Sequence, residues 1–128
     1  MEEKLMKNEK KRIGKIGEDI ASKYLENRGY SIIERNFSCK NGEIDIIAFD
    51  NETNEIVFIE VKTRTNINYG YPIEAVTKIK QKHIVSASKF FIYSHNLNKF
   101  NIRFDIIEIL KKDKFYIRQT KNCQFLIT

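Results

Sequence analysis

Cysteine and proline are both scarce in this chain of 128 residues, which contains two cysteines and a single proline. Neither Cys39 nor Cys123 stands in a CxxC or Cys/His ligand spacing, so we do not expect a structural zinc site. The charged start MEEKLMKNEKKR lacks the apolar core of a signal peptide, and no apolar run reaches the length of a membrane span. These absences exclude secreted disulfide scaffolds and helical membrane proteins, and they favour a reducing cytoplasm.

The composition is that of a folded domain, with 41% hydrophobic and 31% charged residues. The sequence has no internal repeat, no low-complexity block and no linker rich in Pro, Gly or Ser. We therefore predict a flexible N-terminal arm over residues 1–9 and a single domain over residues 10–128.

The charge balance points to a polyanionic partner. The formal net charge is +6 and the isoelectric point is about 9.3. An excess of Lys and Arg favours nucleic acid, although a basic protein without such a partner has the same composition. Composition alone leaves both interpretations open.

The hydrophobic pattern predicts seven main elements. A helix is expected over 10–28, strands over 30–37, 101–110 and 114–120, a hairpin over 42–62, and a helix from Thr77, as N-cap, to about His95. The run 123–128 is a candidate for a short last strand, and 63–76 reads as a loop. The expected inner faces of the two helices are Ile13, Ile16, Gly17, Ile20, Ala21, Tyr24 and Leu25, and Ile79, Ile84, Ala87, Phe90 and Phe91. This order predicts an α/β fold with a mixed sheet and a helix on each side.

The hairpin GEIDIIAFDNETNEIVFIEVK carries charged residues inside apolar runs. The turn-forming run DNETNE sets a register in which Asp45 faces Glu60 and Glu43 faces Lys62. Because side chains alternate along a strand, all four lie on one face at one end of the hairpin. Two opposed carboxylates repel each other, so this arrangement requires a compensating group.

A divalent cation is one such group. Mg²⁺ or Mn²⁺ prefers oxygen ligands, which Asp45, Glu60 and the backbone carbonyl of Val61 offer, and Lys62 then points at the same place. These are the parts needed for metal-assisted phosphodiester hydrolysis. The alternative is a solvated, charged end of a hairpin. Against it, IVFIEVK is apolar on both faces, which is typical of a covered central strand.

The pattern Asp45…Glu60-Val61-Lys62 resembles that of the PD-(D/E)xK nuclease superfamily, with Ile44 where the superfamily name has proline. Further segments together resemble the YraN-like family of small bacterial proteins, itself similar to archaeal Holliday junction resolvases. They are GKIGEDIASKYLENRGYSIIERNF, GEIDIIAFD, VFIEVKTR, YGYPIEAVTKIKQKHIVSASKFFI and RFDIIEI. The likeness spans roughly residues 14–110.

The resemblance implies a restriction-endonuclease-like, three-layer α/β/α core. It implies Asp45, Glu60 and Lys62 as the catalytic core, with Glu18 of the first helix as a further acidic group, although the periodicity also allows Glu18 to lie on the surface. The implied activity is a Mg²⁺-dependent deoxyribonuclease that cuts structured or branched DNA, and a homodimer is expected by analogy.

Five basic residues are candidates for phosphate contacts: Lys15, Arg64, Lys78, Lys80 and Lys82. For any one of them a solvated surface position is the alternative. Two other functions remain open for the whole chain, namely a nucleic-acid-binding module without activity and a protein-interaction domain. Metal binding that depends on Asp45 and Glu60 separates the enzyme from both.

Overall fold

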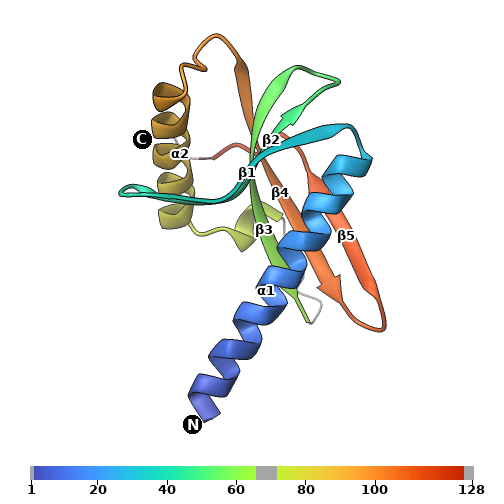
Figure 1. Cartoon of the computed structure of the whole chain (residues 1–128). Coiled ribbons are helices and arrows are strands. Elements are labelled where there is room, and N and C mark those ends of the chain that lie inside the picture. The colour runs from blue at the N-terminus through green and yellow to red at the C-terminus, as the bar shows by residue number, and fades with distance from the viewer. Residues whose placement is uncertain (1, 66–71, 126–128) are drawn as a thin grey trace.

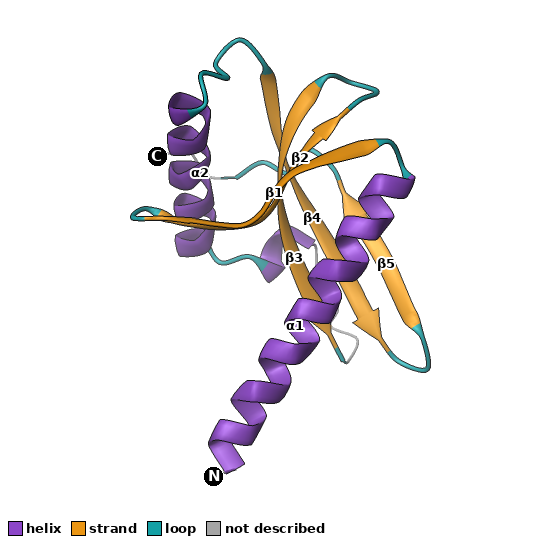
Figure 2. Cartoon of the chain, viewed as in Figure 1, coloured by secondary structure: helices purple, strands orange, loops and turns teal. Residues whose placement is uncertain are grey.

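The computed structural model describes residues 2–65 and 72–125. It contains two long helices, one short 3₁₀ helix and five strands (Figures 1 and 2). Their order is α1 (Glu2–Asn27), β1 (Tyr30–Cys39), β2 (Gly42–Asp50), β3 (Glu55–Arg64), η1 (Pro72–Ala75), α2 (Lys78–Ser94), β4 (Asn101–Lys111) and β5 (Phe115–Thr120). The expected order of helices and strands is therefore confirmed from α1 to β5.

The five strands form one mixed sheet in the order β1-β2-β3-β4-β5. β3 and β4 are parallel and are joined through α2, while all other neighbours are antiparallel. Separate clusters of buried apolar side chains pack α1 on one face of the sheet and α2 on the other. The predicted α/β fold with a mixed central sheet is confirmed, and it is compatible with a restriction-endonuclease-like α/β/α core.

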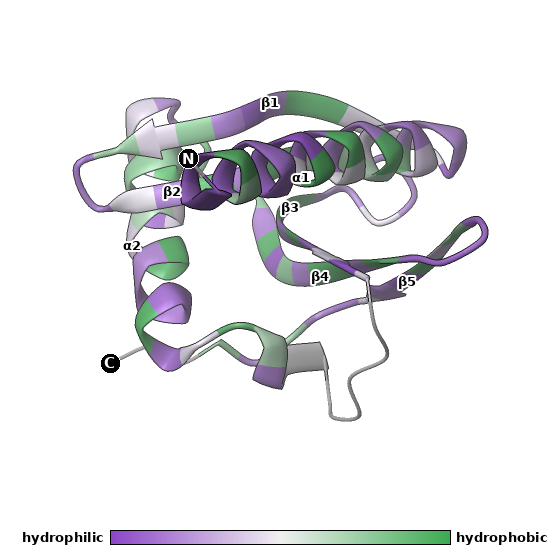
Figure 3. Cartoon of the chain, turned by 90° about the horizontal axis from the view of Figure 1, so that it is seen from below, coloured by the Kyte–Doolittle hydropathy of each residue, from purple (hydrophilic) through white to green (hydrophobic). Residues whose placement is uncertain are grey.

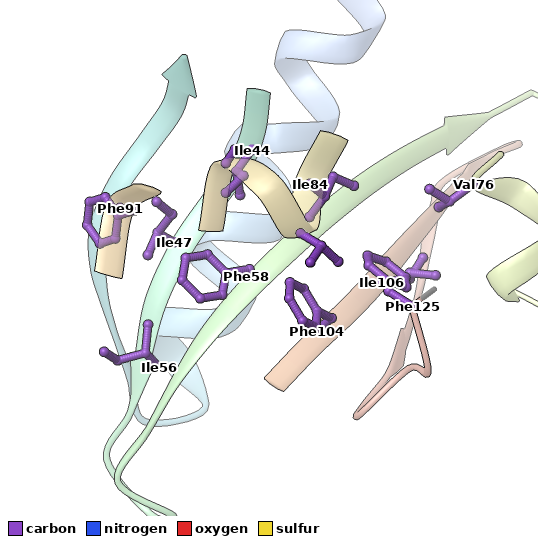
Figure 4. Close-up of a cluster of buried hydrophobic side chains, with 12 residues drawn as sticks. Ile44, Ile47, Ile56, Phe58, Val76, Ile84, Phe91, Phe104, Ile106 and Phe125 are labelled. Carbon is purple, nitrogen blue, oxygen red and sulfur yellow. The ribbon is translucent and has the colours of Figure 1, made fainter. Parts of the chain in front are cut away.

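The core under α2 is built from branched aliphatic and aromatic side chains (Figure 4). Phe58, Phe91 and Ile84 are almost completely buried there. The Thr77 side chain accepts a hydrogen bond from the Lys80 backbone N–H at 3.1 Å, so the predicted N-cap is confirmed. The predicted inner face of α2 was wrong at two residues.

Ile79 and Phe90 are the two residues of α2 that the sequence misplaced. Ile79 is 69% exposed and Phe90 is 47% exposed. The face that turns inward is instead completed by Val85 and by the polar side chains Gln81 and Ser88. Hydrophobicity alone overlooks the two polar residues, which donate hydrogen bonds to the Val76 and Val85 carbonyls.

Helix α1 begins at Glu2, eight residues before the expected start at Lys10, and residues 2–12 are all exposed. The division into a flexible arm and a domain stays a prediction. The face of α1 against the sheet is narrow and consists of Gly17, Ala21, Ser22 and Leu25. Ile16, which the apolar stripe placed inside, is 38% exposed.

Two glycines of α1 have opposite surroundings, and this predicts opposite effects of alanine. A Cβ at Gly17 would overlap the Thr63 side chain, whereas a Cβ at Gly14 would meet nothing within 4 Å. We expect Gly14→Ala to stabilise the protein by about 0.5–1 kcal/mol, because alanine favours the helix. Gly17→Ala should destabilise it by about 1–3 kcal/mol through overpacking.

Urea denaturation of both variants measures this difference, and removing the Thr63 hydroxyl in Gly17→Ala/Thr63→Ala should recover most of the loss. Equal effects of the two alanines would contradict the close approach of α1 to β3 at Gly17.

The end of the β1–β2 hairpin leaves the sheet and curls over α2 (Figure 1). Phe37 of β1 packs edge-on against Phe91 of α2 with ring centroids 5.1 Å apart. At the tip, Gly42 lies so close to the His83 carbonyl that a Cβ there would contact it at 2.8 Å. The hairpin therefore follows α2 and diverges from β3.

This divergence opens a fork between β2 and β3. The predicted register is confirmed from the pair Asp50–Glu55 to the pair Ile46–Ile59, where the ladder ends. The expected opposition of Glu43 and Lys62 is wrong, because β2 has already left β3 at that point. Asp45 and Glu60 lie just beyond the last pair and form no ladder pair with each other.

The last predicted strand is not formed in its described part, Cys123–Phe125. Instead, the Cys123 N–H donates to the Phe104 carbonyl at 2.7 Å, and the Phe125 ring stacks on the Phe104 ring at 5.1 Å. Residues 126–128 lie outside the described part. In the predicted loop 63–76, β3 continues to Arg64 and η1 follows, while 66–71 lie outside the described residues.

Candidate metal centre

Asp45 lies in the fork between β2 and β3. Its Oδ2 accepts a hydrogen bond from the Val61 backbone N–H at 2.8 Å. That N–H has lost its ladder partner because β2 curves away, and the carboxylate replaces the missing backbone carbonyl. The bond fixes Asp45 against β3 beside Glu60.

Glu60 is the most deeply buried of the candidate residues, with 4% of its surface exposed. Its Oε2 has no hydrogen-bond partner among the described residues, and the Lys80 ammonium forms an ion pair with it at 3.7 Å. Burial raises the pKa of Glu60 to about 9, together with hydrogen bonding to Asp45 and the charge of Asp45, against the opposing charges of Lys80 and Lys62. Lys80 and Lys62 therefore offset only part of the cost of burying this carboxylate.

The raised pKa makes Glu60 a source of instability above acidic pH in the metal-free protein. Because the folded-state pKa lies above the ordinary 4.5, the associated stability is present below pH 4.5 and is lost as the pH rises towards 9. Glu60→Gln should therefore match the wild type near pH 4.5 and exceed its stability by about 1–3 kcal/mol at pH 8.

Urea denaturation of both proteins in EDTA across this range gives the difference in stability. Groups far from Glu60 titrate equally in the two proteins, so the difference reports Glu60 together with Asp45, with which it interacts. A difference that stays constant with pH, or that favours the wild type at pH 8, would contradict the burial of an uncompensated carboxyl group.

Glu18 approaches the fork from α1. Burial, and next the charge of Asp45, raise the pKa of Glu18 against the opposing effect of Arg35. With its amide nitrogen turned towards Glu18, the orientation that its surroundings favour, Asn36 donates to the two carboxylate oxygens at 3.0 and 3.1 Å. Glu18 is thus half-buried and close enough to Asp45 for the charge of Asp45 to raise its pKa.

The candidate cations differ in their surroundings. Lys62 is half-buried next to Glu60, and its charge lowers the pKa of that group. The Arg64 guanidinium lies 3.4 Å from the Glu108 carboxylate, so this arginine is already engaged. Lys78 and Lys82 are exposed at the start of α2, and Lys15 is exposed on α1. The structure brings Lys62 and Lys80 to the carboxylates and leaves the other three lysines at the surface.

Comparison with known proteins agrees with the sequence motifs. Residues 17–109 match the model of the uncharacterised protein family UPF0102. The chain belongs to the UPF0102 family. This is the YraN-like family that the motifs indicated, and the resemblance is confirmed.

Individual UPF0102 proteins are similar over most of their length. A UPF0102 protein of Caldanaerobacter subterraneus subsp. tengcongensis is 50% identical over 105 residues, which cover 82% of this chain and 84% of the relative. One from Clostridium perfringens strain 13 is 47% identical over 116 residues, with 91% and 90% covered. One from Clostridium botulinum strain Hall is 54% identical over 101 residues, with 78% and 80% covered.

The donor set of this UPF0102 chain fits a hard cation. Asp45 and Glu60 offer neighbouring carboxylate oxygens, and the Oε2 atom of Glu60 accepts no hydrogen bond from a described residue and has only the Lys80 ammonium at 3.7 Å. Among the described residues no three His, Cys, Asp or Glu side chains form a closed metal cage. Mg²⁺ commonly binds through one or two carboxylates, with waters and phosphate oxygens completing its shell. The Val61 N–H serves Asp45, and its carbonyl as a ligand stays a prediction.

Two features of the UPF0102 chain escaped the sequence analysis. One is Asn36, whose φ of 53° lies in the left-handed region that asparagine tolerates. No pattern in the sequence predicts this backbone conformation. The other is Arg103 of β4, buried beside the first residues of β3 and hydrogen-bonded to Asp50, Glu55 and Asp105. The sequence contained a sign of this network, because Arg103 and Asp105 carry opposite charges within the apolar strand NIRFDIIEIL.

One further finding concerns membranes. Over residues 2–65 and 72–125, neither helix combines the length and the apolar character needed to cross a bilayer.

Proposed function

We propose that this UPF0102 chain is a metal-dependent endonuclease that hydrolyses phosphodiester bonds in structured or branched DNA. The observation that carries the proposal is the fork between β2 and β3. There the buried Glu60 carboxylate, with an oxygen that lacks a hydrogen-bond partner, lies beside the anchored Asp45 carboxylate. A buried pair of this kind is costly unless a cation joins it, which favours a metal centre over a charged hairpin end.

Each residue has a role in this proposal. Asp45 and Glu60 hold Mg²⁺ or Mn²⁺, and Glu18 faces the same place with its orientation set by Asn36. When bound, the metal lowers the pKa of a water molecule and offsets negative charge on the phosphate. Lys62 donates hydrogen bonds to the attacking water or to the phosphate oxygens.

The surface around the fork suits a polyanion. Lys15, Lys78, Lys80 and Lys82 lie on the two helices that flank the sheet and supply phosphate contacts in the proposal. Arg64 contributes less because Glu108 already binds it. Such contacts do not depend on base sequence, which agrees with recognition of DNA by shape. A homodimer that presents two such sites is part of the same proposal.

Cleavage assays test the proposal directly. The purified protein is incubated with a labelled four-way junction, a flapped duplex and a linear duplex, each with Mg²⁺, Mn²⁺ or EDTA. We expect metal-dependent cuts in the branched substrates and weaker cutting of the linear duplex. Binding to all three without cleavage under any metal would reject the enzymatic function.

A non-catalytic nucleic-acid-binding module is the second candidate. The observation in its favour is the Lys80 ammonium, which pairs with Glu60 at 3.7 Å and partly replaces a metal charge. If this pair is the permanent state, Lys80→Gln should weaken DNA binding and leave the protein unable to bind Mn²⁺. If the metal centre is functional, the same substitution should strengthen Mn²⁺ binding by removing a competing cation.

A further inference from the structure

The first three turns of α1 extend beyond the rest of the domain (Figures 1 and 2). Every residue from 2 to 12 is exposed, and hydrophilic residues dominate this end of the helix in Figure 3. Within it, Lys4, Lys7, Lys11 and Lys15 follow one another at spacings of three, four and four. At 3.6 residues per turn, these spacings place the four lysines within about 80° of the helix circumference. We call them the lysine stripe.

The lysine stripe is a concentrated positive surface. None of its members forms an ion pair with another described residue, whereas Arg12 on a different side of the helix pairs with Glu9 at 2.6 Å. By the same geometry the acidic residues Glu2 and Glu9 lie on the opposite side of the helix, and Glu3 lies at the edge of the stripe, about 40° from Lys7. Lysines four apart repel each other and destabilise a helix by about 0.2–0.5 kcal/mol per pair. A bound polyanion removes that repulsion.

The stripe leads into the candidate site. An open hollow of about 560 Å³ at its inner end is lined by Lys11, Lys15, Glu18, Arg35 and their neighbours. Glu18 is the carboxylate that α1 presents to the fork, so the same hollow borders the stripe and the candidate metal centre. The Arg35 guanidinium lies there with its Nε buried and without a hydrogen-bond partner in the described chain, while its Nη2 group pairs with Asp19 at 2.7 Å. Positively charged side chains thus follow one side of α1 from its N-terminal end to Glu18.

We propose that the lysine stripe binds the phosphate backbone of a double-stranded arm that flanks the site of cleavage. This inference rests on the proposed function and adds the form of the substrate. From Lys4 to Lys15 the helix rises about 16 Å, which corresponds to about five base pairs of duplex. A substrate therefore needs a paired arm of at least that length on the α1 side of the fork.

A phosphate backbone suits the stripe better than an anionic membrane does. A membrane-binding helix has a broad apolar face opposite its basic face. In the exposed turns the large apolar residues are Leu5 and Met6, which are adjacent in sequence and therefore point about 100° apart. They do not form a common apolar face.

The experiment compares two triple variants with the same change in net charge. K4Q/K7Q/K11Q removes the outer stripe, and K111Q/K112Q/K114Q removes three exposed lysines from the β4–β5 turn. Both leave Lys15 in place, and glutamine keeps the helix propensity of lysine. Circular dichroism confirms that the helix content is unchanged. Binding is measured in EDTA with junctions whose arms are 3, 5, 8 and 12 base pairs long, at several salt concentrations.

We expect the wild type and the turn variant to bind more tightly as the arm grows past about five base pairs. The stripe variant should lose this gain, bind long arms at least tenfold more weakly, and show a salt slope lower by about two to three. A stripe variant indistinguishable from the turn variant overturns the inference and leaves the proposed function intact.

Two further outcomes separate the stripe from the catalytic proposal. Arm-length-dependent binding by the wild type, together with no cleavage of the same junctions when Mg²⁺ or Mn²⁺ is supplied, contradicts the enzyme but supports the stripe. Stripe-dependent binding to vesicles containing phosphatidylserine, with DNA binding equal in the two variants, overturns the stripe as a DNA contact and assigns it to a membrane surface.

Discussion

Replacing Asp45 by asparagine should reduce metal-dependent cleavage of branched DNA by about a thousandfold or more. Asparagine retains an oxygen that can accept the hydrogen bond from the Val61 N–H, now 2.8 Å from Asp45, so the fork between β2 and β3 should keep its shape. What the substitution removes is the negative charge that holds the cation. Loss of a charged ligand or of a single stabilising group in such a site commonly lowers turnover by about 10²–10³-fold or more.

The control is Asp113→Asn, which makes the same chemical change at an exposed position in the β4–β5 turn. Rates are measured under single-turnover conditions with saturating protein, so that weaker DNA binding does not imitate weaker chemistry. Thermal denaturation in EDTA confirms that both variants are folded. If Asp45→Asn cuts within threefold of Asp113→Asn, Asp45 does not hold a catalytic metal.

Replacing Arg103 by methionine should destabilise the fold by about 3–5 kcal/mol, the largest stability effect we expect from one substitution. The Arg103 guanidinium is 5% exposed and donates to Asp50 at 2.8 Å, to Glu55 at 3.0 Å and to the Tyr30 hydroxyl at 2.6 Å. It also binds Asp105, which is completely buried. Methionine fills similar space but leaves these carboxylates buried without their cation.

Arg118→Met is the matched control, because Arg118 also pairs with a carboxylate of β4, Glu108, but is 58% exposed. Because Arg118 is exposed and Glu108 keeps Arg64 at 3.4 Å, removing Arg118 should cost only about 0–1 kcal/mol, so this variant should unfold close to the wild type in urea. Arg103→Met/Asp105→Asn should be less destabilised than the sum of its single substitutions, because it removes one orphaned charge. Equal stability of Arg103→Met and Arg118→Met would contradict a structural role for the buried network.

The register of the hairpin could be predicted because local chemistry determines it. A turn-forming run fixes the loop, and the alternation of apolar residues fixes the face. The end of the ladder at Ile46–Ile59 could not be predicted in this way. It depends on contacts between Phe37 and Phe91, and between Gly42 and His83, which join segments about fifty residues apart. Periodicity contains no information about such contacts.

Helix α1 shows how a correctly predicted inner face can contain one misplaced residue. Ile20 and Tyr24 of the apolar stripe do pack against the core. Ile16 is exposed although it belongs to the same stripe, whereas the neighbouring Gly17 lies so close to β3 that a Cβ would overlap the Thr63 side chain. Size, rather than hydrophobicity, selects residues at such a close approach. The small residues Gly17 and Ala21 could be seen in the sequence. That they, rather than Ile16, face the sheet depends on the distance between helix and sheet.

The candidate site likewise has residues that the sequence could propose and contacts that required the structure. Asp45, Glu60 and Lys62 could be proposed from the sequence, because their spacing within one hairpin and the family motif both point to them. The Lys80–Glu60 ion pair and the contact of Asn36 with Glu18 join different elements and required the structure. The buried Arg103 network also joins different elements, although the alternating charges of Arg103 and Asp105 were visible in the sequence.

Calorimetric titration of the protein with Mn²⁺ tests the central claim most directly, because it asks whether the Asp45–Glu60 pair holds a metal without requiring a known DNA substrate. The wild type, Asp45→Asn, Glu60→Gln and the control Asp113→Asn are titrated at pH 8 after dialysis against EDTA and its removal. Our account predicts one Mn²⁺ site per chain in the wild type and in Asp113→Asn, and no saturable binding in the other two. Binding to Asp45→Asn and Glu60→Gln with the affinity of the wild type would contradict it.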